Sequence, residues 1–411
     1  MDPIIVIGAG AAGLTAAYAA ASSGAPVTLL EKNREAGKKI NITGKGRCNL
    51  TNDCSPQDFL QNVVRNPKFL SGAIYELSPE KTKDLFASFG LELKTERGNR
   101  VFPLSDRAKD VTDALVSACK KAGVTVRFDC PVKEIKTSQS GGFLVTAGGS
   151  KLRASAVIVA TGGVSYPATG STGDGYSFAE KTGHTVLPAR PALVGMELSK
   201  RTKEFHNLAL KNVALEARLA GQPFRREFGE MEFTPFGVGG PIVLTLSSYL
   251  SLEEGKELTL FLDLKPALSE KALDARLLRD FAERNTQPMK DALRKLLVKE
   301  LVSPVLRQAG VSEEEKPATL SKEKRAALVS AVKNLALGKA VLRPVKEGIV
   351  TAGGVSVKEI DPKTMESKLC PGLYFAGEVL DVDALTGGYN LQIAFSTGYR
   401  AGNSAAKEIL G

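Results

Sequence analysis

The feature that most constrains the fold is a glycine-rich turn directly after the first predicted strand. A short β-branched run from Ile4 to Ile7 leads into the letters GAGAAG, and an alanine-rich stretch of helical character continues to about Ser23. A second apolar run, Val27 to Leu30, follows. This order predicts a strand, a helix and a parallel strand, which is the start of an α/β nucleotide-binding fold.

Three glycines in this turn, Gly8, Gly10 and Gly13, have the spacing G-x-G-x-x-G, and Glu31 ends the second strand eighteen positions beyond Gly13. The first glycine permits a tight turn, the second lets the backbone approach a pyrophosphate, and the third lets helix and strand pack closely. The helix N-terminus offers unpaired N–H groups to phosphates, and Glu31 accepts hydrogen bonds from a ribose. These residues together predict dinucleotide binding.

Two later strands indicate which dinucleotide is bound. The letters VIVATGG at 157–163 are a buried strand ending in a Thr-Gly-Gly bend, and GLYFAGEV at 372–379 is a strand ending in Gly377 and Glu378. An extended FAD molecule needs a second contact near its pyrophosphate and ribityl chain. The ATGG bend alone is equally typical of an ordinary strand end, but the three motifs in this order favour FAD.

A closing helix is expected shortly after the pair Gly387 and Gly388. Its start is expected near Asn390 or Leu391, and the helical spacing is clear from about Gln392. Its first N–H groups would face the electron-rich pyrimidine end of a reduced flavin. The alternative is a glycine-rich helix start without a ligand.

The segment Lys39 to Asn52, KINITGKGRCNLTN, is polar and basic. It is no phosphate-binding P-loop, because six residues separate Gly37 from Gly44-Lys45 and a glycine stands where Ser or Thr would bind Mg²⁺. No aromatic residue is interleaved for base stacking, which weakens a nucleic-acid interpretation. A flavin-side loop remains, with a solvated basic loop as the alternative. The loop residues expected at the flavin are Thr43, Gly44, Gly46, Arg47 (as a charge partner), Cys48 and Asn49.

Composition restricts the chemistry further. The 411 residues are 43% hydrophobic and 24% charged, which is ordinary for a soluble protein of two or three domains. No apolar run is long enough for a membrane span, so a cytoplasmic protein without a membrane partner is expected. The five cysteines are scattered without a C-x-x-C, so neither disulfides nor a metal site is expected. Only two histidines are present, so the chemistry is expected to belong to a cofactor.

From about Pro188 the pattern changes. Alternating apolar and polar residues on both sides of the letters AGQP predict a β-hairpin with one wet face, and from Ser269 to about Leu337 the spacing predicts about three helices. Between Lys265 and Lys346 there are 18 Lys and Arg against 10 Asp and Glu, so this segment carries +8 of the chain's net charge of +10. The helical insert is therefore the expected basic surface.

Several segments resemble the bacterial aminoacetone-oxidase-type flavoproteins, the YhiN-like family. The matching letters are KKINITGKGRCNLTN, GNRVFP, ATGGVSYPATGSTGDGY, GHTVLPARPALVGME and the block from VTAGGVSV through GEVLDVDALTGGYNLQIAFSTG. The resemblance implies an α/β fold with a split Rossmann-like, glutathione-reductase-type FAD domain (1–188 and 350–411). A β-rich substrate-side domain (189–265 and 338–349) would be inserted in it, with a helical domain (266–337) inserted in turn.

The resemblance also implies the flavin contacts, residue by residue. Val132 follows from the CPVKEI strand, whose backbone would meet the adenine. The complete set is Gly8, Gly10, Ala12, Gly13, Glu31, Lys32, Lys38, Thr43, Gly44, Arg47, Cys48, Asn49, Val132, Thr161, Gly162, Gly377, Glu378, Gly388, Asn390 and Leu391.

The chain departs from the family pattern at two places. Where relatives tend to show T-H-x-G-x-S-G-P, this chain reads TPFGVGGP, with Pro235 for the histidine and Gly239 for the serine, and Ala384-Leu385 replaces Gly-Pro. Any role of that histidine in substrate binding or proton transfer is therefore missing here.

The function expected is an FAD-dependent oxidoreductase that transfers a hydride between flavin and a small organic substrate. It would either oxidise an amine or reduce an activated C=C or C=O with electrons from NAD(P)H, although a second G-x-G-x-x-G is absent. The candidate catalytic residues are Tyr389, Arg47 and Asn390, with Tyr166 weaker and His184 structural.

Two other functions stay open. The less favoured alternative is a nucleic-acid-directed flavoprotein of the tRNA-modifying type that docks through the basic helical insert. A flavin-binding regulator without turnover is the third.

Overall fold

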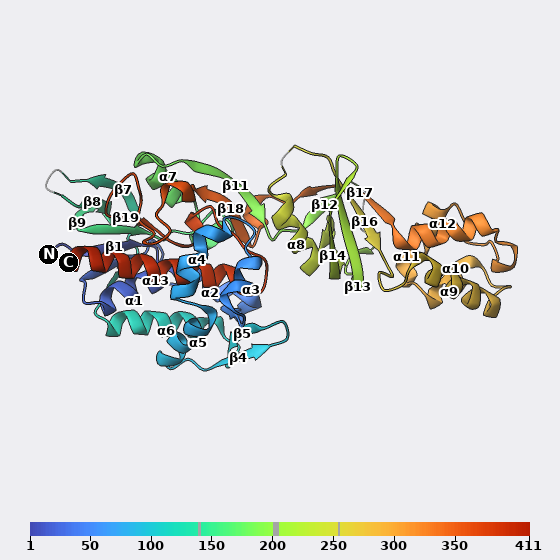
Figure 1. Ribbon diagram of the computed structural model, residues 1–411, viewed down its shortest axis with the longest axis horizontal. Helices are drawn as coiled ribbons and strands as arrows, with labels where there is room; N and C mark the ends of the chain where they lie inside the picture. Colours follow the sequence, from blue (N-terminus) through green and yellow to red (C-terminus); the bar gives the residue numbers. More distant parts are fainter. Residues whose placement is uncertain (139–140, 200–204, 254) are drawn as a thin grey trace. The chain divides into compact units, whose positions relative to one another are not determined.

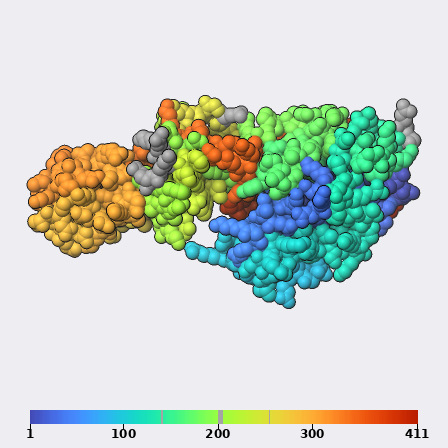
Figure 2. Space-filling model, turned by 180° about the vertical axis from the view of Figure 1, so that it is seen from behind, coloured from blue at the N-terminus to red at the C-terminus, as the bar shows by residue number. Residues whose placement is uncertain are grey.

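The computed structural model describes residues 1–138, 141–199, 205–253 and 255–411, and the chain divides into two compact units (Figure 1). One unit comprises Met1–Ala192 and Pro344–Gly411, and the other comprises Leu193–Arg343. The first unit is therefore built from both ends of the chain. Figure 2 shows the same division by colour, with the second unit running from light green to orange.

A five-stranded parallel sheet forms the centre of the first unit, in the order β19-β10-β1-β2-β6. The strands β1 and β10 are buried along their whole length, as expected for parallel strands covered on both faces. The predicted βαβ start is confirmed. The strands are β1 (Ile4–Ile7), β2 (Val27–Leu30), β6 (Thr125–Arg127), β10 (Ala156–Val159) and β19 (Leu373–Phe375).

Three helices lie on one side of this sheet in Figure 1: α1 (Ala11–Ser22), α6 (Ala108–Lys121) and α13 (Tyr389–Leu410). Helices α1 and α13 approach closely, because a Cβ at Gly398 or Gly402 would overlap the backbone of α1. An antiparallel sheet lies on the other side and consists of β7 (Val132–Thr137), β8 (Phe143–Ala147) and β9 (Ser150–Ala154).

Shorter elements complete the first unit. Helix α5 (Pro79–Ser88) is capped, because its N-cap Ser78 accepts a hydrogen bond from the N–H of Lys81 (3.2 Å). The other elements are α2 (Lys38–Ile42), α3 (Pro56–Gln61), α4 (Pro67–Glu76), α5 (Pro79–Ser88), α7 (Asp174–Lys181), the sheet of β3 (Thr51–Asn52), β5 (Arg100–Pro103) and β4 (Leu93–Glu96), and the pair β11 (Val186–Ala192) and β18 (Val350–Val355).

The second unit contains a closed barrel in the order β12-β15-β14-β13-β16-β17. The predicted hairpin is confirmed as β13 and β14, and Ala220 and Gly221 connect these strands with φ of 48° and 80°. Positive φ at both turn positions matches the twist of paired strands. The barrel strands are β12 (Met196–Leu198), β13 (Ala209–Leu219), β14 (Gln222–Phe233), β15 (Gly237–Gly239), β16 (Leu258–Asp263) and β17 (Leu335–Leu342).

The helices of the second unit share one apolar core with the barrel. Two expectations need correction. About three helices are expected from Ser269 to about Leu337, but the letters PMKDALRKLLVKELV alone form two, because Val298 is extended (φ −65°, ψ 147°). Residues 335–337 belong to β17, because Leu335 and Ala336 pair with β16. The helices are α8 (Pro241–Leu250), α9 (Glu270–Glu283), α10 (Met289–Ala292), α11 (Lys299–Ala309) and α12 (Lys322–Lys333).

Candidate functional site

The glycine turn after β1 lies at the carboxyl edge of the sheet, where the strand order switches. Strand β1 pairs with β2 on one side and with β10 on the other. The N–H of Gly8 donates to Leu30 O (2.8 Å), and the N–H of Ala160 donates to Ile7 O (2.9 Å). Open α/β sheets bind ligands at such a switch point.

The three motif glycines have different surroundings. Gly8 has φ +101°, and a Cβ there would lie 2.6 Å from Ala160 O. A Cβ at Gly13 would overlap the carbonyl oxygen of Gly8. Gly10, at the N-cap of α1, has no described atom within 4 Å of the place of a Cβ. This open space beside a helix N-terminus fits a pyrophosphate, so the fold is suited to a dinucleotide at this turn.

Glu31 is buried at the end of β2, and its carboxylate organises the turn. One oxygen accepts from the N–H of Ala9 (2.7 Å), and the other accepts from the N–H (2.8 Å) and side-chain amide (2.7 Å) of Asn33. The N–H of Cys130 donates to Glu31 O (2.9 Å), which ties the segment leading to Val132 and β7 to the same edge. The predicted ribose and adenine contacts therefore converge.

The two lysines predicted after Glu31 have protein partners. Lys32 Nζ lies 2.6 Å from Asp174 Oδ2 and donates to Thr172, while Lys38 Nζ donates to Asn33 Oδ1 at 3.4 Å. Each of these lysines is thus held near the turn by a side chain from the first unit.

The segment expected to be a loop folds as α2 followed by a tight turn of left-handed residues. Gly44, Lys45 and Gly46 have φ of 57°, 59° and 85°, and Cys48 has φ 59°. The N–H of Cys48 donates to Thr43 O (3.0 Å). The Cys48 thiol is fully buried, and burial raises its pKa to about 12. The Cys48 thiol is therefore no thiolate nucleophile at neutral pH.

Asn49 joins this segment to the start of α13. With its amide oriented so that both groups are paired, Asn49 donates to Thr51 O and Val101 O and accepts from the N–H of Gly388 (3.1 Å). A Cβ at Gly388 would overlap the backbone of Thr51. The two motifs predicted to flank the flavin are therefore neighbours, although they are far apart in the sequence.

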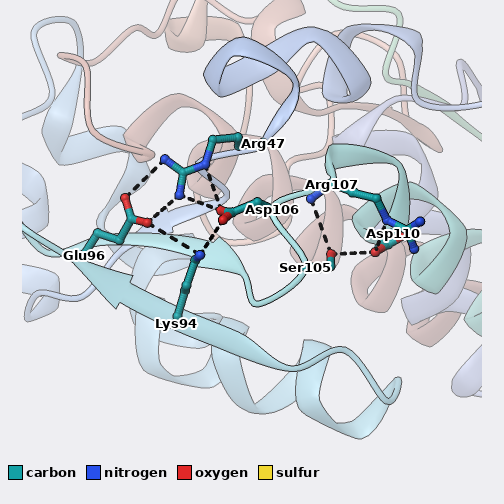
Figure 3. Close-up of polar contacts among 7 residues, drawn as sticks. All are labelled: Arg47, Lys94, Glu96, Ser105, Asp106, Arg107 and Asp110. Carbon is teal, nitrogen blue, oxygen red and sulfur yellow. Dashed lines mark hydrogen bonds and ion pairs between the residues drawn. The ribbon is translucent and has the colours of Figure 1, made fainter.

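Arg47 lies in an ion-pair network that Figure 3 shows. Its guanidinium pairs with Glu96 and, at 2.5 Å, with Asp106, and it stacks over the Phe102 ring at 4.3 Å from the centroid. Lys94 also pairs with Asp106 (2.6 Å). The hydrogen bonds from Lys94 and Arg47 lower the pKa of Asp106. The charge of Arg47 is thus neutralised by carboxylates of the chain itself.

The predicted residue Glu378 forms a network at the opposite side of the switch point with three residues outside the predicted set, Lys39, Ser165 and Thr351. Lys39 Nζ lies 2.6 Å from both Glu378 Oε2 and Ser165 Oγ, and Glu378 Oε1 accepts from Ser165 Oγ (2.8 Å) and from the N–H of Thr351 (2.7 Å). Burial alone would raise the pKa of Glu378, but the Lys39 ammonium and these hydrogen bonds hold that pKa below its usual value. Four distant segments meet in this network.

The other motif positions on this side follow the carboxyl ends of β10 and β19. The N–H of Gly377 donates to Thr397 Oγ1 of α13 (2.9 Å). A Cβ at Gly162 would meet Ser171 Oγ at 3.1 Å. The Thr161 hydroxyl is buried and has no hydrogen bond in the described structure, so it is free to accept a ligand partner.

The catalytic candidates at the start of α13 have structural contacts. Tyr389 is buried, its ring packs edge-on against Phe59 (5.2 Å between centroids), and burial raises its pKa to about 12. The Asn390 amide closes the preceding loop, accepting from the N–H of Ala384 (2.9 Å) and donating to Ala384 O (2.7 Å). Leu391 packs against the core. The helix begins at Tyr389, slightly earlier than expected.

A buried carboxylate lies in the loop between Glu378 and α13. Asp383 is completely buried, and neither of its carboxylate oxygens has a hydrogen bond in the described structure. Arg65 Nε lies 3.2 Å from Asp383 Oδ1, and Arg65 Nη1 lies 3.4 Å from Asp381 Oδ1. Burial raises the pKa of Asp383 to about 7, against the lowering effect of Arg65.

No group of three or more His, Cys, Asp or Glu side chains in the described residues is arranged to hold a metal ion. Among the described helices, none is long and apolar enough to cross a membrane.

Comparison with known proteins agrees with the Rossmann-like fold of the first unit. The family described as "HI0933-like protein Rossmann domain" matches residues 2–404. The 3-dehydro-bile acid delta(4,6)-reductase of Clostridium scindens is 33% identical to this chain, and the match covers 99% of this chain and 100% of the relative. The ribosomal RNA dihydrouridine synthase of Haemophilus influenzae is 31% identical, with 98% of each chain covered.

A solved structure with the same fold is 3-ketosteroid delta1-dehydrogenase from Sterolibacterium denitrificans. It has a TM-score of 0.53 and 15% identity, covering 98% of this chain and 99% of the other. At this identity the similarity concerns the fold alone.

Proposed function

We propose that this chain reduces a C=C bond conjugated to a carbonyl group. The chain belongs to the HI0933-like family and is an FAD-dependent oxidoreductase. The observation that carries the proposal is the shared chemistry in the names of two of its full-length relatives. One name specifies a ketone (3-dehydro) and the double bonds that are reduced (delta 4,6). The other specifies dihydrouridine, in which the double bond conjugated to a uracil carbonyl is saturated.

Bound FAD would supply the hydride in this reaction, with NAD(P)H as the electron donor. In our proposal Gly10 and the N-terminus of α1 hold the pyrophosphate, and Glu31 holds the adenosine ribose. The Thr43–Asn49 turn and the Gly388 N-terminus of α13 line the ring, and the Lys39–Glu378 pair fixes Gly377 beside it. Arg47 acts through the position of that turn, because its own charge is paired with Glu96 and Asp106.

An anaerobic titration tests the proposal. The flavin absorbance of the purified protein should bleach on addition of NADPH or NADH, and cyclohex-2-enone should restore it with one equivalent of saturated ketone formed. Bleaching by a primary amine, without bleaching by either nicotinamide, would instead support amine oxidation. A reduced flavin that neither an enone nor a uridine-containing RNA reoxidises would contradict the proposal.

A uridine in RNA is the second candidate substrate, and the name of the Haemophilus influenzae relative favours it. The basic helical segment is the expected docking surface, but many of its cations are already paired. Lys295 pairs with Asp280 (3.4 Å), Arg325 with Asp274 (2.6 Å) and Lys333 with Asp263 (2.8 Å). RNA binding that weakens steeply between low and moderate salt would support this candidate, and no binding at low salt would exclude it.

A further inference from the structure

Tyr166 lies at the carboxyl edge of the sheet. It follows Ser165, which belongs to the Lys39–Glu378 network. The preceding residue, Ser165, is completely buried, and its N–H donates to Thr351 Oγ1 (3.0 Å). The Ser165 hydroxyl contacts both Lys39 and Glu378. The backbone that carries Tyr166 is therefore fixed to the segments that hold the predicted flavin contacts.

The Tyr166 backbone is held in a strained conformation. Its φ is +50° and its ψ is +59°, and Pro167 follows. Left-handed backbone is unfavourable for a residue with a bulky side chain. Thr169 stabilises the turn, because its N–H (2.9 Å) and its hydroxyl (2.8 Å) both donate to Tyr166 O. Strain of this kind collects at functional sites.

The Tyr166 side chain is 40% exposed, and its hydroxyl makes no hydrogen bond within the described residues. Several other proton donors near this edge are engaged or buried. Lys39 and Glu378 are paired with each other, the Cys48 thiol is fully buried, and Tyr389 packs against Phe59. Tyr166 therefore offers an accessible O–H group at a fixed place on this edge.

We propose that the Tyr166 hydroxyl is the general acid of the reduction, an inference that rests on the proposed function. Bound cofactor would supply a hydride to the β-carbon of the conjugated system. The Tyr166 hydroxyl would give its proton to the α-carbon, where the π electron pair would form the new C–H bond. The resulting phenolate regains a proton from water, which its exposure permits. NAD(P)H and one solvent proton together supply the two hydrogens, and NAD(P)⁺ is the other product.

Replacing Tyr166 with phenylalanine tests this role. In rapid-mixing experiments, reoxidation of the reduced Tyr166→Phe protein by cyclohex-2-enone should be about 10²- to 10⁴-fold slower than in the parent protein. Its reduction by NADPH, its FAD content and its thermal midpoint should stay unchanged. Tyr75→Phe is the matched control, because Tyr75 is also exposed (46%) but lies on α4, and it should behave as the parent protein.

A second variant separates the effect of losing the hydroxyl from the effect of the strained backbone. Asparagine accepts left-handed backbone more readily than tyrosine, so Tyr166→Asn should be at least as stable as the parent and as slow as Tyr166→Phe. Parental reoxidation rates in both variants would overturn the role of Tyr166 and leave the proposed function standing. A parent protein that no enone reoxidises would overturn both.

A readout without turnover is nitration of tyrosine by tetranitromethane, followed by peptide mass spectrometry. Tyr166 should be nitrated in the oxidised protein, and saturating cyclohexanone should protect it while leaving Tyr75 unprotected. Equal nitration of Tyr166 with and without the ketone would contradict a contact between this hydroxyl and the substrate.

Discussion

Gly13→Ala should destabilise the protein severely and, with the fold, remove FAD binding. A Cβ at this position would overlap the carbonyl oxygen of Gly8, so helix α1 has to move away from β1. Alanine gains about 1 kcal/mol of helix propensity over glycine, but forcing an extra carbon against rigid backbone costs about 3 kcal/mol or more. Chemical denaturation of the variant with and without added FAD measures the loss.

Gly10→Ala is the informative partner, because it changes the same turn without a clash. No described atom lies within 4 Å of the place of its Cβ, and its backbone (φ −86°, ψ −168°) suits alanine. Its apoprotein should therefore be as stable as the parent apoprotein. Its affinity for FAD should fall about tenfold or more, since the methyl group occupies the space where a pyrophosphate approaches.

Gly402→Ala completes the comparison, because a Cβ there would overlap the backbone of Ala16, which lies on α1 three residues beyond Gly13. This variant should lose stability as Gly13→Ala does, and the FAD affinity of its folded fraction should be parental. A Gly10→Ala protein that binds FAD with parental affinity would show that the cofactor lies elsewhere.

Local signals explain which parts of this fold could be predicted. The first βαβ unit, helix α5 and the β13–β14 hairpin each depend on neighbouring residues, through apolar spacing, a Ser cap and a turn with Gly. Helix α12 was predicted to run into β17, because Leu335, Ala336 and Leu337 suit either element and only pairing with β16 decides between them.

The motifs of the predicted site could be recognised in the sequence, but the side chains that pair with the site residues could not. Arg47 was expected to pair with the flavin, yet Glu96 and Asp106 neutralise it, and neither carboxylate has a sequence signal that links it to Arg47. Lys39 and Glu378 form an ion pair across 339 positions, and only the folded sheet brings them together. Tyr166 has a weak signal in sequence, because its importance rests on a backbone conformation that composition does not encode.

The second large effect concerns pH and the buried Asp383. Its pKa in the folded protein is raised to about 7, whereas an unfolded aspartate has a pKa of about 3.9. Between these values the folded state binds a proton that the unfolded state lacks. The free energy of unfolding should therefore fall as pH rises from about 4 to about 7, by up to about 1.4 kcal/mol per pH unit and about 4 kcal/mol in total.

Asp383→Asn isolates this contribution, because asparagine has nearly the shape of a protonated aspartate and does not titrate. The free energy of unfolding of the variant minus that of the parent should rise between pH 5 and pH 8.

His184→Gln is the control for which the pH dependence has the opposite sign. Burial lowers the pKa of His184, so parental stability due to His184 is lost as pH falls below about 6.5. Relative to the parent, His184→Gln should therefore gain stability toward low pH.

A flat difference for Asp383→Asn across this range would show that Asp383 stays ionised. In that case Arg65, 3.2 Å away, would outweigh the desolvation of the carboxylate. The expected slope instead makes the loop between Glu378 and α13 a place where the folded protein stores a proton near neutral pH. Because neither oxygen of Asp383 has a hydrogen bond in the described structure, that proton is held by desolvation and is not fixed by a hydrogen-bond partner.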